Sequence, residues 1–426
     1  MAELLRDIAR RNRGGEAAGI WAACTANPTV LEACIAEAVA DDGPLLVEAT
    51  CNQVNQDGGY TGMTPPAFRD QLLALADRQG LRRDRLVLGG DHLGPSPWQG
   101  LPAERALAKA EAMVAAYAAA GFTKIHLDAS MACADDPLPL PPTVIAERAA
   151  ALCAVAERHG QPVYVIGTEV PTPGGAQEAL DHVTPTRVED LAETIAVHRA
   201  AFARRGLDAA WERVLAVVVQ PGVEFGQDSV AEFEPRAAAG LSRAILAEDR
   251  LVFEAHSTDY QRVESLRALV EAHFAVLKVG PGLTFAYREA LFALELIEAE
   301  LLPAAERSDL RRVLDEAMLR RPGDWQRHHH GSPAEQAFAR AWSLSDRSRY
   351  YWPAPEVAAA AGRLIANLSG RKLPATLLSQ LMPAQHGAWR DGRLEAEPRA
   401  LIEHKVREVA RGYAFACGMA PSPQLP

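Results

Sequence analysis

Cysteine is scarce in this chain, and its spacing argues against two classes of protein. Six of the 426 residues are cysteine, at positions 24, 34, 51, 133, 153 and 417. These intervals are not those of zinc-binding pairs or of a disulfide-rich secreted domain. We therefore expect reduced, mostly buried thiols and a cytoplasmic location.

Positive charge and long apolar runs are also lacking. Lysine and arginine number 44 against 55 aspartate and glutamate residues, which gives a net charge of −11. This balance argues against nucleic acid or an anionic membrane as the main partner. No apolar run is long enough to span a bilayer, and residues 1–13 are a charged amphipathic segment without the apolar core of a signal peptide.

Two glycine-rich nucleotide-binding signatures are missing as well. No Gly-x-Gly-x-x-Gly follows the first apolar segment, which disfavours an open dinucleotide-binding sheet. The absence of a Gly-x-x-x-x-Gly-Lys-Ser/Thr loop argues against kinase chemistry.

What the chain does contain is a regular series of short apolar segments. They alternate with helical stretches every roughly thirty to forty residues, about the size of one βα unit. The eight segments are residues 19–24, 44–50, 86–88, 123–128, 162–169, 213–220, 251–256 and 274–280. Their near-continuous Val, Ile and Leu content is typical of strands buried on both faces. The pattern predicts an α/β fold, a closed (β/α)₈ TIM barrel, over residues 1–282.

After residue 282 the pattern becomes helical. It predicts a helical extension, residues 283–426, packed on the barrel, with helices at residues 285–301, 309–319, 334–341, 356–368 and 401–416. A segment rich in arginine and aromatic residues, 345–352, reaches over the barrel mouth or forms a subunit contact, and spacing alone does not choose. Within the barrel, Thr186 and Glu189 have the spacing of a capping box for the next helix.

Polar residues gather where the predicted strands end, which is the face that carries the active site in such barrels. Any one polar strand end is unremarkable, but carboxylates and imidazoles at seven of eight ends indicate a functional site. The residues are Glu48, Asp91, His92, Asp128, Glu169, Gln220, Glu224, Glu254, His256 and Lys278.

These types of residue predict a metal centre with acid–base groups beside it. His92, Glu169 and His256 form a set of two nitrogen ligands and one oxygen ligand that suits one divalent ion, Zn²⁺, Mn²⁺, Co²⁺ or Ni²⁺. Gln220 is a fourth ligand or a substrate contact. Asp91 or Glu169 would serve as the general base, and Asp128 is a further catalytic candidate.

The loops after the last two strands predict a phosphate site. Ser257 and Thr258 follow the seventh strand, and Gly280 begins the turn into the next helix, whose N-terminal N–H groups attract anions. Lys278 and Arg288 add positive charge, although a plain turn would also explain the glycines. The remaining predicted substrate contacts are Glu48, Asn52, Gln53 and Gln220.

Eight long motifs resemble those of one protein family. They lie at residues 48–62, 89–95, 124–131, 166–175, 219–225, 254–261, 277–286 and 343–352, and include Gly-Gly-Asp-His-Leu-Gly-Pro and Glu-Ala-His-Ser-Thr-Asp-Tyr-Gln. The chain resembles, over nearly its whole length, the D-tagatose-bisphosphate aldolase class II non-catalytic subunit family. That family was formerly named for tagatose 6-phosphate kinases, and it includes ketose and ketose-phosphate 4-epimerases.

The resemblance implies a zinc barrel related to the class II aldolases. Asp91 and His92 match the base and metal ligand of those enzymes, and His256 matches their last metal histidine. Residues 174–175 match the glycine-containing loop after their fifth strand. Gln220 stands where those enzymes have a middle metal histidine, so Glu169 would have to take over that ligand position.

Two functions follow from this resemblance. The first is a metal-dependent 4-epimerase that interconverts tagatose 6-phosphate and fructose 6-phosphate, or the free sugars, by retro-aldol and aldol steps. The alternative is a non-catalytic subunit that stabilises and activates a class II tagatose-1,6-bisphosphate aldolase. We favour the enzyme because the strand-end carboxylates and histidines are intact. We expect a sugar phosphate ligand, a homo-oligomer and, for the alternative, an aldolase catalytic subunit as partner.

Overall fold

Eight parallel strands close into a barrel in the computed structural model of the chain, which describes residues 1–170, 175 and 183–420. The strands are β1 (Ile20–Ala23), β2 (Leu45–Thr50), β3 (Leu86–Leu93), β4 (Lys124–Leu127), β5 (Val163–Ile166), β6 (Val214–Val218), β9 (Val252–Ala255) and β10 (Val276–Val279). The barrel closes where Ile20 of β1 pairs with Val276 of β10. The predicted (β/α)₈ barrel is confirmed, and every predicted apolar segment coincides with one of its strands.

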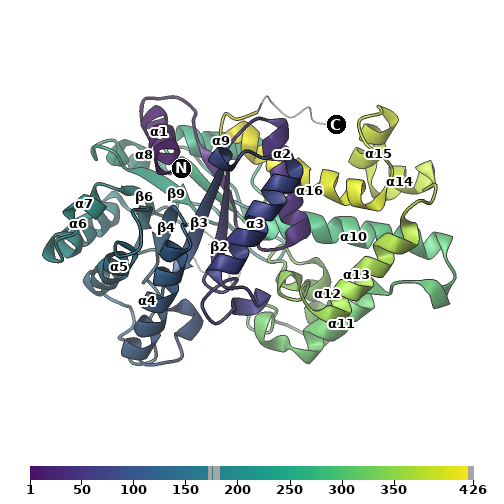
Figure 1. Ribbon diagram of the computed structural model, residues 1–426, viewed down its shortest axis with the longest axis horizontal. Helices are drawn as coiled ribbons and strands as arrows, with labels where there is room; N and C mark the ends of the chain where they lie inside the picture. Colours follow the sequence, from purple (N-terminus) through teal and green to yellow (C-terminus); the bar gives the residue numbers. More distant parts are fainter. Residues whose placement is uncertain (171–174, 176–182, 421–426) are drawn as a thin grey trace.

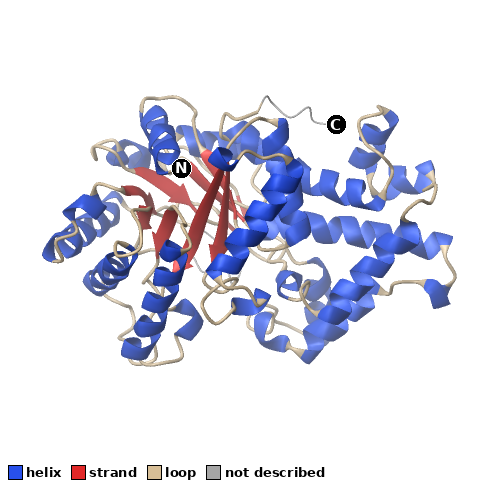
Figure 2. Ribbon diagram, in the orientation of Figure 1, coloured by secondary structure: helices blue, strands red, loops and turns tan. Residues whose placement is uncertain are grey.

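Helices between successive strands form the outer wall of the barrel (Figures 1 and 2). Asn27 starts the first of them by accepting hydrogen bonds from the N–H groups of Thr29 and Val30, and Pro28 occupies its first turn. The wall helices are α2 (Pro28–Ala40), α3 (Pro65–Gln79), α4 (Ala103–Ala119), α5 (Pro142–Ala156), α6 (Val188–Arg204), α8 (Ala239–Ile245) and α9 (Val263–Glu271).

Shorter elements join or cover the barrel. The helix α1 (Ala2–Arg13) contributes Leu5 and Ile8 to the same apolar cluster as the inward side chains of the strands, so it closes one end of the barrel. The others are α7 (Asp208–Trp211), the antiparallel pair β7 (Glu224–Phe225) and β8 (Val230–Ala231), and the 3₁₀ turns η1 (Gly59–Thr61), η2 (Arg83–Arg85) and η3 (Ser96–Trp98). In the loop after β5, Gly175 is described and Gly174 lies outside the described residues.

The chain after β10 is helical, and most of it lies to one side of the barrel (Figure 1). Its elements are α10 (Pro281–Leu301), η4 (Ala304–Glu306), α11 (Leu310–Arg320), η5 (Pro322–Asp324), α12 (Pro333–Trp342), η6 (Arg347–Tyr350), α13 (Pro355–Leu368), α14 (Ala375–Leu381), α15 (Pro383–Arg390) and α16 (Pro398–Ala416). The sequence did not predict α14 and α15. Among the described helices, none combines the length and apolar character needed to cross a membrane.

The last helix returns to the barrel wall. α16 packs against α2, α9 and α10, and Glu37 of α2 forms ion pairs with Arg407 and Arg411 at 2.7 and 3.0 Å. The carbonyl of Cys417, directly after α16, accepts a hydrogen bond from the N–H of Gly19 beside β1. The division at residue 282 remains a prediction. One helix of the barrel wall, α16, comes from residues far beyond that position.

The inside of the barrel changes character along the strands. Toward α1, the inward side chains are apolar and include Leu46, Val252 and Val276. Two residues further along each of these strands come Glu48, Glu254 and Lys278, which point to the same side because strand side chains alternate. We call the apolar part the lower interior, and it also includes Val163, Val165 and Ala216. The upper interior comprises Glu48, Asp91, Lys124, His126, Glu254, His256 and Lys278.

Candidate metal and sugar site

Two lysines hold the carboxylates of the upper interior together. Lys124, whose side chain is fully buried, forms ion pairs with Glu48 at 2.5 Å and with Glu254 at 2.6 Å. Lys278 pairs with Glu48 and lies 2.8 Å from Oδ1 of Asp91. Buried charges need such partners, since an unpaired charge in this surrounding would be strongly destabilising.

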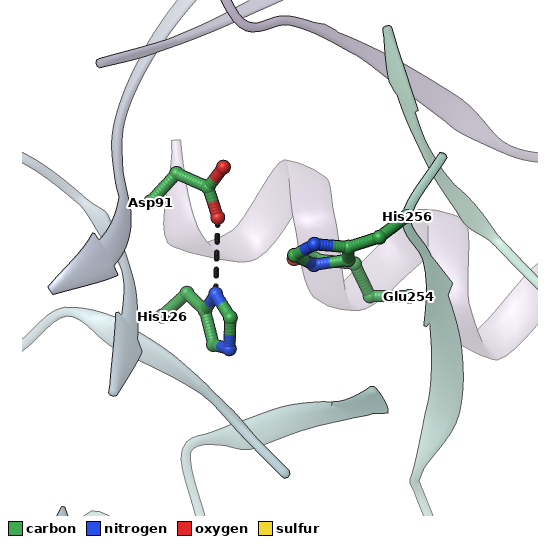
Figure 3. A group of neighbouring side chains, drawn as sticks. All are labelled: Asp91, His126, Glu254 and His256. Carbon is green, nitrogen blue, oxygen red and sulfur yellow. Dashed lines mark hydrogen bonds and ion pairs between the residues drawn. The ribbon is translucent and has the colours of Figure 1, made fainter. Parts of the chain in front are cut away.

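Four metal-type side chains converge in the upper interior, and two of them, Asp91 and Glu254, take part in these ion pairs. Ligand-type atoms of Asp91, His126, Glu254 and His256 all lie within 4.8 Å of one another. Asp91 and His126 come from the neighbouring strands β3 and β4, and Glu254 and His256 point toward them from across the barrel (Figure 3). We call these four residues the metal-type cluster.

Hydrogen bonds fix which ring nitrogens of the histidines are free to bind a metal. Nδ1 of His126 lies 3.0 Å from Oδ1 of Asp91 and 3.3 Å from the backbone nitrogen of His92. The shorter contact is to a carboxylate, which only accepts, and it favours the tautomer with the proton on Nδ1. Nε2 of His126 is then a lone-pair donor, and it is buried without a hydrogen-bond partner among the described residues. In the same way, Nε2 of His256 donates to Glu254 at 3.0 Å, which leaves the lone pair on Nδ1.

His92 lies beside the cluster and is oriented by Asp128. Its Nδ1 donates to Oδ2 of Asp128 at 2.8 Å, and its ring lies 4.8 Å from the ring of His256. The backbone at His92 has a φ of +50°, the left-handed region, which turns its side chain from the regular strand direction. A carboxylate behind a histidine is the usual support for a metal-binding imidazole.

Burial and neighbouring charges shift the pKa values of these groups in opposite directions. Burial disfavours the charged form of His92, but Asp91 and Asp128 outweigh it and raise the pKa of His92 to about 9. For His256, burial is the largest influence and lowers the pKa. Burial also opposes ionisation of Glu254, yet Lys124 and His256 lower its pKa to about 2. Without a metal, His92 is therefore charged at neutral pH, and His256 is neutral.

The composition of the cluster fits a divalent ion. Two imidazoles and two carboxylates suit Zn²⁺, Mn²⁺, Co²⁺ or Ni²⁺. The four buried carboxylates Glu48, Asp91, Asp128 and Glu254 exceed the two buried lysines, Lys124 and Lys278, by two negative charges before the histidines are counted. One divalent ion would balance that excess, and Nε2 of His126, which no described residue bonds, offers it a ligand.

A cavity of about 70 Å³ lies over the cluster. Of the predicted substrate-binding residues, Asn52, Gln53, Ser257, Lys278 and Gly280 line it, together with Asp91, His92 and His256. Glu48 lies beneath the cavity in the ion pairs, and the Thr258 hydroxyl donates to the carbonyl of Lys278 at 2.6 Å. A second cavity of about 530 Å³ adjoins the first and shares Cys24, Gln53, Tyr60 and Arg349 with it.

Glu169 and Gln220 lie in a different hydrogen-bonded group. Glu169 is exposed, and its Oε2 accepts a hydrogen bond from the Thr186 hydroxyl at 2.6 Å. Oε1 of Gln220 accepts from the N–H groups of Gly222 and Val223, at 2.8 and 2.9 Å. The structure brings His92 and His256 together but leaves these two residues out of the cluster. Their role as metal ligands, and that of Glu169 as a base, remain predictions.

The capping box predicted at Thr186 is wrong. The N-cap of α6 is Arg187, and no side chain among the described residues caps this helix end. The hydroxyl of Thr186 is instead held by Glu169 and accepts from the N–H of Gln220 at 2.9 Å. The sequence spacing is that of a capping box, but the hydroxyl of Thr186 bonds to Glu169 and Gln220 and not to the helix N-terminus.

The helical region supplies part of the cavity wall. Arg349 and Tyr350 of η6 line it, which shows that the segment 345–352 reaches over the barrel mouth. Asp346 anchors this turn, since its buried carboxylate pairs with Arg288 at 2.7 Å and accepts from Thr284 of α10. The charge of Arg288 is therefore used inside the protein and not at the predicted phosphate site.

Sequence reasoning did not select Lys124, His126, Arg349 or Tyr350 as site residues. A usable signal was present in β4, where Lys124 and His126 are two residues apart and so face the same side. Glu254 and His256 have the same spacing on β9, so two strands carry charged and imidazole side chains toward one point.

Known proteins show where this chain belongs. It is 48% identical to a protein described as a probable tagatose 6-phosphate kinase from Sinorhizobium meliloti 1021, with a TM-score of 0.88 and coverage of 94% of this chain and 100% of the other. The YdjI aldolase from Escherichia coli K12 is 11% identical, with a TM-score of 0.44 over 67% of this chain and 84% of that one. A fructose-bisphosphate aldolase from Campylobacter jejuni is 13% identical, with a TM-score of 0.43 over 86% and 92% of the two chains.

The family match is the most direct of these findings. Residues 5–418 match the family described as D-tagatose-1,6-bisphosphate aldolase subunit GatZ/KbaZ-like. The match spans the barrel, η6 and α16, so it includes the metal-type cluster and the cavity wall. The resemblance seen in the motifs is confirmed: the chain belongs to the GatZ/KbaZ-like family of D-tagatose-1,6-bisphosphate aldolase subunits.

Proposed function

We propose that this chain is a metal-dependent 4-epimerase of a ketohexose or its 6-phosphate. The observation that carries the proposal is the metal-type cluster of Asp91, His126, Glu254 and His256 beneath a polar cavity at the barrel mouth. Acid–base groups next to a metal-type site are what retro-aldol chemistry on a sugar requires. The family supports a role with the tagatose skeleton.

His126, Glu254 and His256 would hold the ion, and His92 is placed to join them, while Asp91 beside them is kept for proton transfer. When bound, a divalent ion supplies Lewis-acid polarisation of a carbonyl oxygen. The chain contributes the orientation of these ligands: Asp91 fixes the ring of His126, Glu254 fixes that of His256, and Asp128 fixes that of His92.

Inversion at C4 requires one bond to break and form again. A carboxylate at the cavity, for which we assign Asp91, takes the proton of the C4 hydroxyl. The C3–C4 bond then breaks, C4 becomes an aldehyde, and the electron pair passes to the C2 carbonyl to give an enediolate. After the aldehyde turns its other face to C3, the bond forms again and the proton returns to the C4 oxygen.

The two adjoining cavities give the sugar room to turn. Both cavities are lined by Cys24, Gln53, Tyr60 and Arg349, and the volumes of the cavities are about 70 and 530 Å³. Arg349 is a cation on both cavities and suits a phosphate at the C6 end of the sugar.

Incubation of the purified chain with fructose 6-phosphate and each candidate metal tests the proposal. We expect tagatose 6-phosphate, identified by carbon NMR, and an Asp91→Asn variant slower by about 10²–10⁴-fold because the amide cannot accept the proton. Free fructose and tagatose are assayed in parallel. Absence of turnover of both phosphorylated and free ketohexoses with every metal would contradict the proposal.

A second function is favoured by the family description and by one exposed surface. The family is named for aldolase subunits, and α12 exposes Phe338 and Trp342 by 63% and 43%. Exposed aromatic side chains of this size suit a protein partner. Co-purification with a class II aldolase chain, and a rise in its activity that Phe338→Ser abolishes, would support an accessory role.

A further inference from the structure

The N-terminus of α10 is placed where barrels of this kind bind phosphate. The helix has 21 residues and begins at Pro281, directly after the eighth barrel strand, and Gly280 and Pro281 line the cavity. Free N–H groups and the positive end of the helix dipole at such a position attract an anion. Barrel enzymes frequently hold the phosphate of their substrate at this junction.

In this chain a carboxylate of the protein already occupies that position. Oδ1 of Asp259 accepts hydrogen bonds from the N–H of Gly280 at 2.9 Å and from the N–H of Gly282 at 2.7 Å. Asp259 is 3% exposed and lines the cavity. The fit is close, since a Cβ at Gly282 would lie 3.2 Å from the same oxygen.

The surroundings keep this carboxylate largely ionised at neutral pH. Burial raises the pKa of Asp259 to about 6, while the two N–H groups and nearby Arg349 act in the opposite direction. A phosphate at this position would find both N–H groups already bonded to Asp259. It would also meet a like charge at a poorly solvated position.

We propose that Asp259 is a specificity-determining residue that excludes phosphate from the sugar end lying over the junction of β10 and α10. The inference rests on the proposed function and names its substrate class: a free ketohexose, or a monophosphate whose phosphate lies in the second cavity, which Arg349 also lines. A 1,6-bisphosphate carries a phosphate at both ends and is rejected. The chain therefore does not take the bisphosphate for which its family is named.

Binding of inorganic phosphate tests the exclusion without any turnover. We expect Asp259→Gly to bind phosphate at least about tenfold more tightly than the wild type by calorimetry, because two N–H groups and a helix N-terminus become free. Asp259→Ser serves if the glycine variant does not fold, since its shorter side chain also opens the position. Asp57→Gly, which removes an exposed carboxylate 53% accessible at its side chain, is the matched control and should not gain affinity.

Sugar binding supplies the second measurement. The wild type should bind fructose 6-phosphate at least about tenfold more tightly than fructose 1,6-bisphosphate, and Asp259→Gly should reduce that ratio. Equal affinity of the wild type for the two sugars would overturn the proposal. So would unchanged phosphate affinity in folded Asp259→Gly and Asp259→Ser variants. If the wild type binds no sugar, the epimerase proposal fails, while the phosphate measurement still decides the role of Asp259.

Discussion

The lower and upper interiors of the barrel lie on the same strands, yet they are stabilised in different ways. The lower interior packs Leu46, Val165 and Val252 against one another and against Leu5 and Ile8 of α1. The upper interior begins two residues further along and holds charges that only their partners make tolerable, such as Lys124 between Glu48 and Glu254. The lower interior therefore supplies stability, and the upper interior uses some of it to keep functional groups in place.

The largest effect should come from breaking the ion pairs of the upper interior. Lys124→Met leaves Glu48 and Glu254 buried with Lys278 as the one remaining lysine of this group, which should reduce the free energy of unfolding by about 3–5 kcal/mol. Val165→Ala in the lower interior should cost about 2 kcal/mol from lost apolar burial. Urea unfolding of both variants measures the difference. A smaller loss for Lys124→Met than for Val165→Ala would show that the upper interior does not depend on these pairs.

The second prediction separates the cluster seen in the structure from the ligand set predicted from sequence. His126→Ala should weaken metal binding by more than the about 10–100-fold typical for loss of a supporting partner, because a direct ligand disappears. Glu169→Ala should leave the metal affinity nearly unchanged, since Glu169 is bonded to Thr186 away from the cluster. Metal content after dialysis is the readout. Loss of metal from Glu169→Ala but not from His126→Ala would favour the ligand set predicted from sequence.

A smaller effect is expected where the helical region meets the cavity. The hydroxyl of Tyr350 accepts from Arg347 and Arg349, at 3.2 and 3.1 Å. With both lone pairs engaged, its proton is directed elsewhere, and a ligand in the cavity can accept it. Tyr350→Phe should reduce kcat/KM of the epimerase by about tenfold through loss of that bond, with unchanged metal content. Unchanged kcat/KM would assign Tyr350 to packing against Tyr60.

A pH-dependent effect concerns two carboxylates near the same cavity. Lys124 and His256 lower the pKa of Glu254 against the effect of burial, whereas burial raises that of Asp259 from 3.8 to about 6. Because the folded chain holds the proton of Asp259 more tightly than the unfolded chain, this residue favours folding at low pH, and that contribution is lost as pH rises through about 6. Asp259→Asn should gain stability relative to the wild type between pH 4 and 7. A constant difference over this range would contradict the assignment.

The barrel could be predicted from the sequence because its strands are buried on both faces. Segments such as residues 163–166 and 214–218 are then continuous apolar runs, and their spacing leaves room for one helix each. The ends of the strands also indicated Asp91, His92 and His256, and these residues line the cavity. The local sequence carries this information because burial on both faces determines where a strand lies, and the chain direction determines at which end of the barrel each strand ends.

The rest of the site depends on contacts that no local pattern records. β5 and β6 end at Ile166 and Val218, so Glu169 and Gln220 follow loop conformations instead of the strand direction. His126 lies within β4 and not beyond its end, although it faces the cluster. Arg349 reaches the cavity through the turn η6. Asp346 anchors this turn by its ion pair with Arg288 of α10, a contact between residues about sixty positions apart.

The position of α16 has a consequence for the order in which this protein is made. Residues 398–416 cover the barrel between α9 and α2, and Arg407 and Arg411 pair with Glu37, which the ribosome produced several hundred residues earlier. Until the last helix emerges, β1 and α2 lack this cover, and their apolar surface stays available to chaperones. Contacts this distant in sequence also slow folding. The barrel of this chain is therefore completed only after α16 has been made.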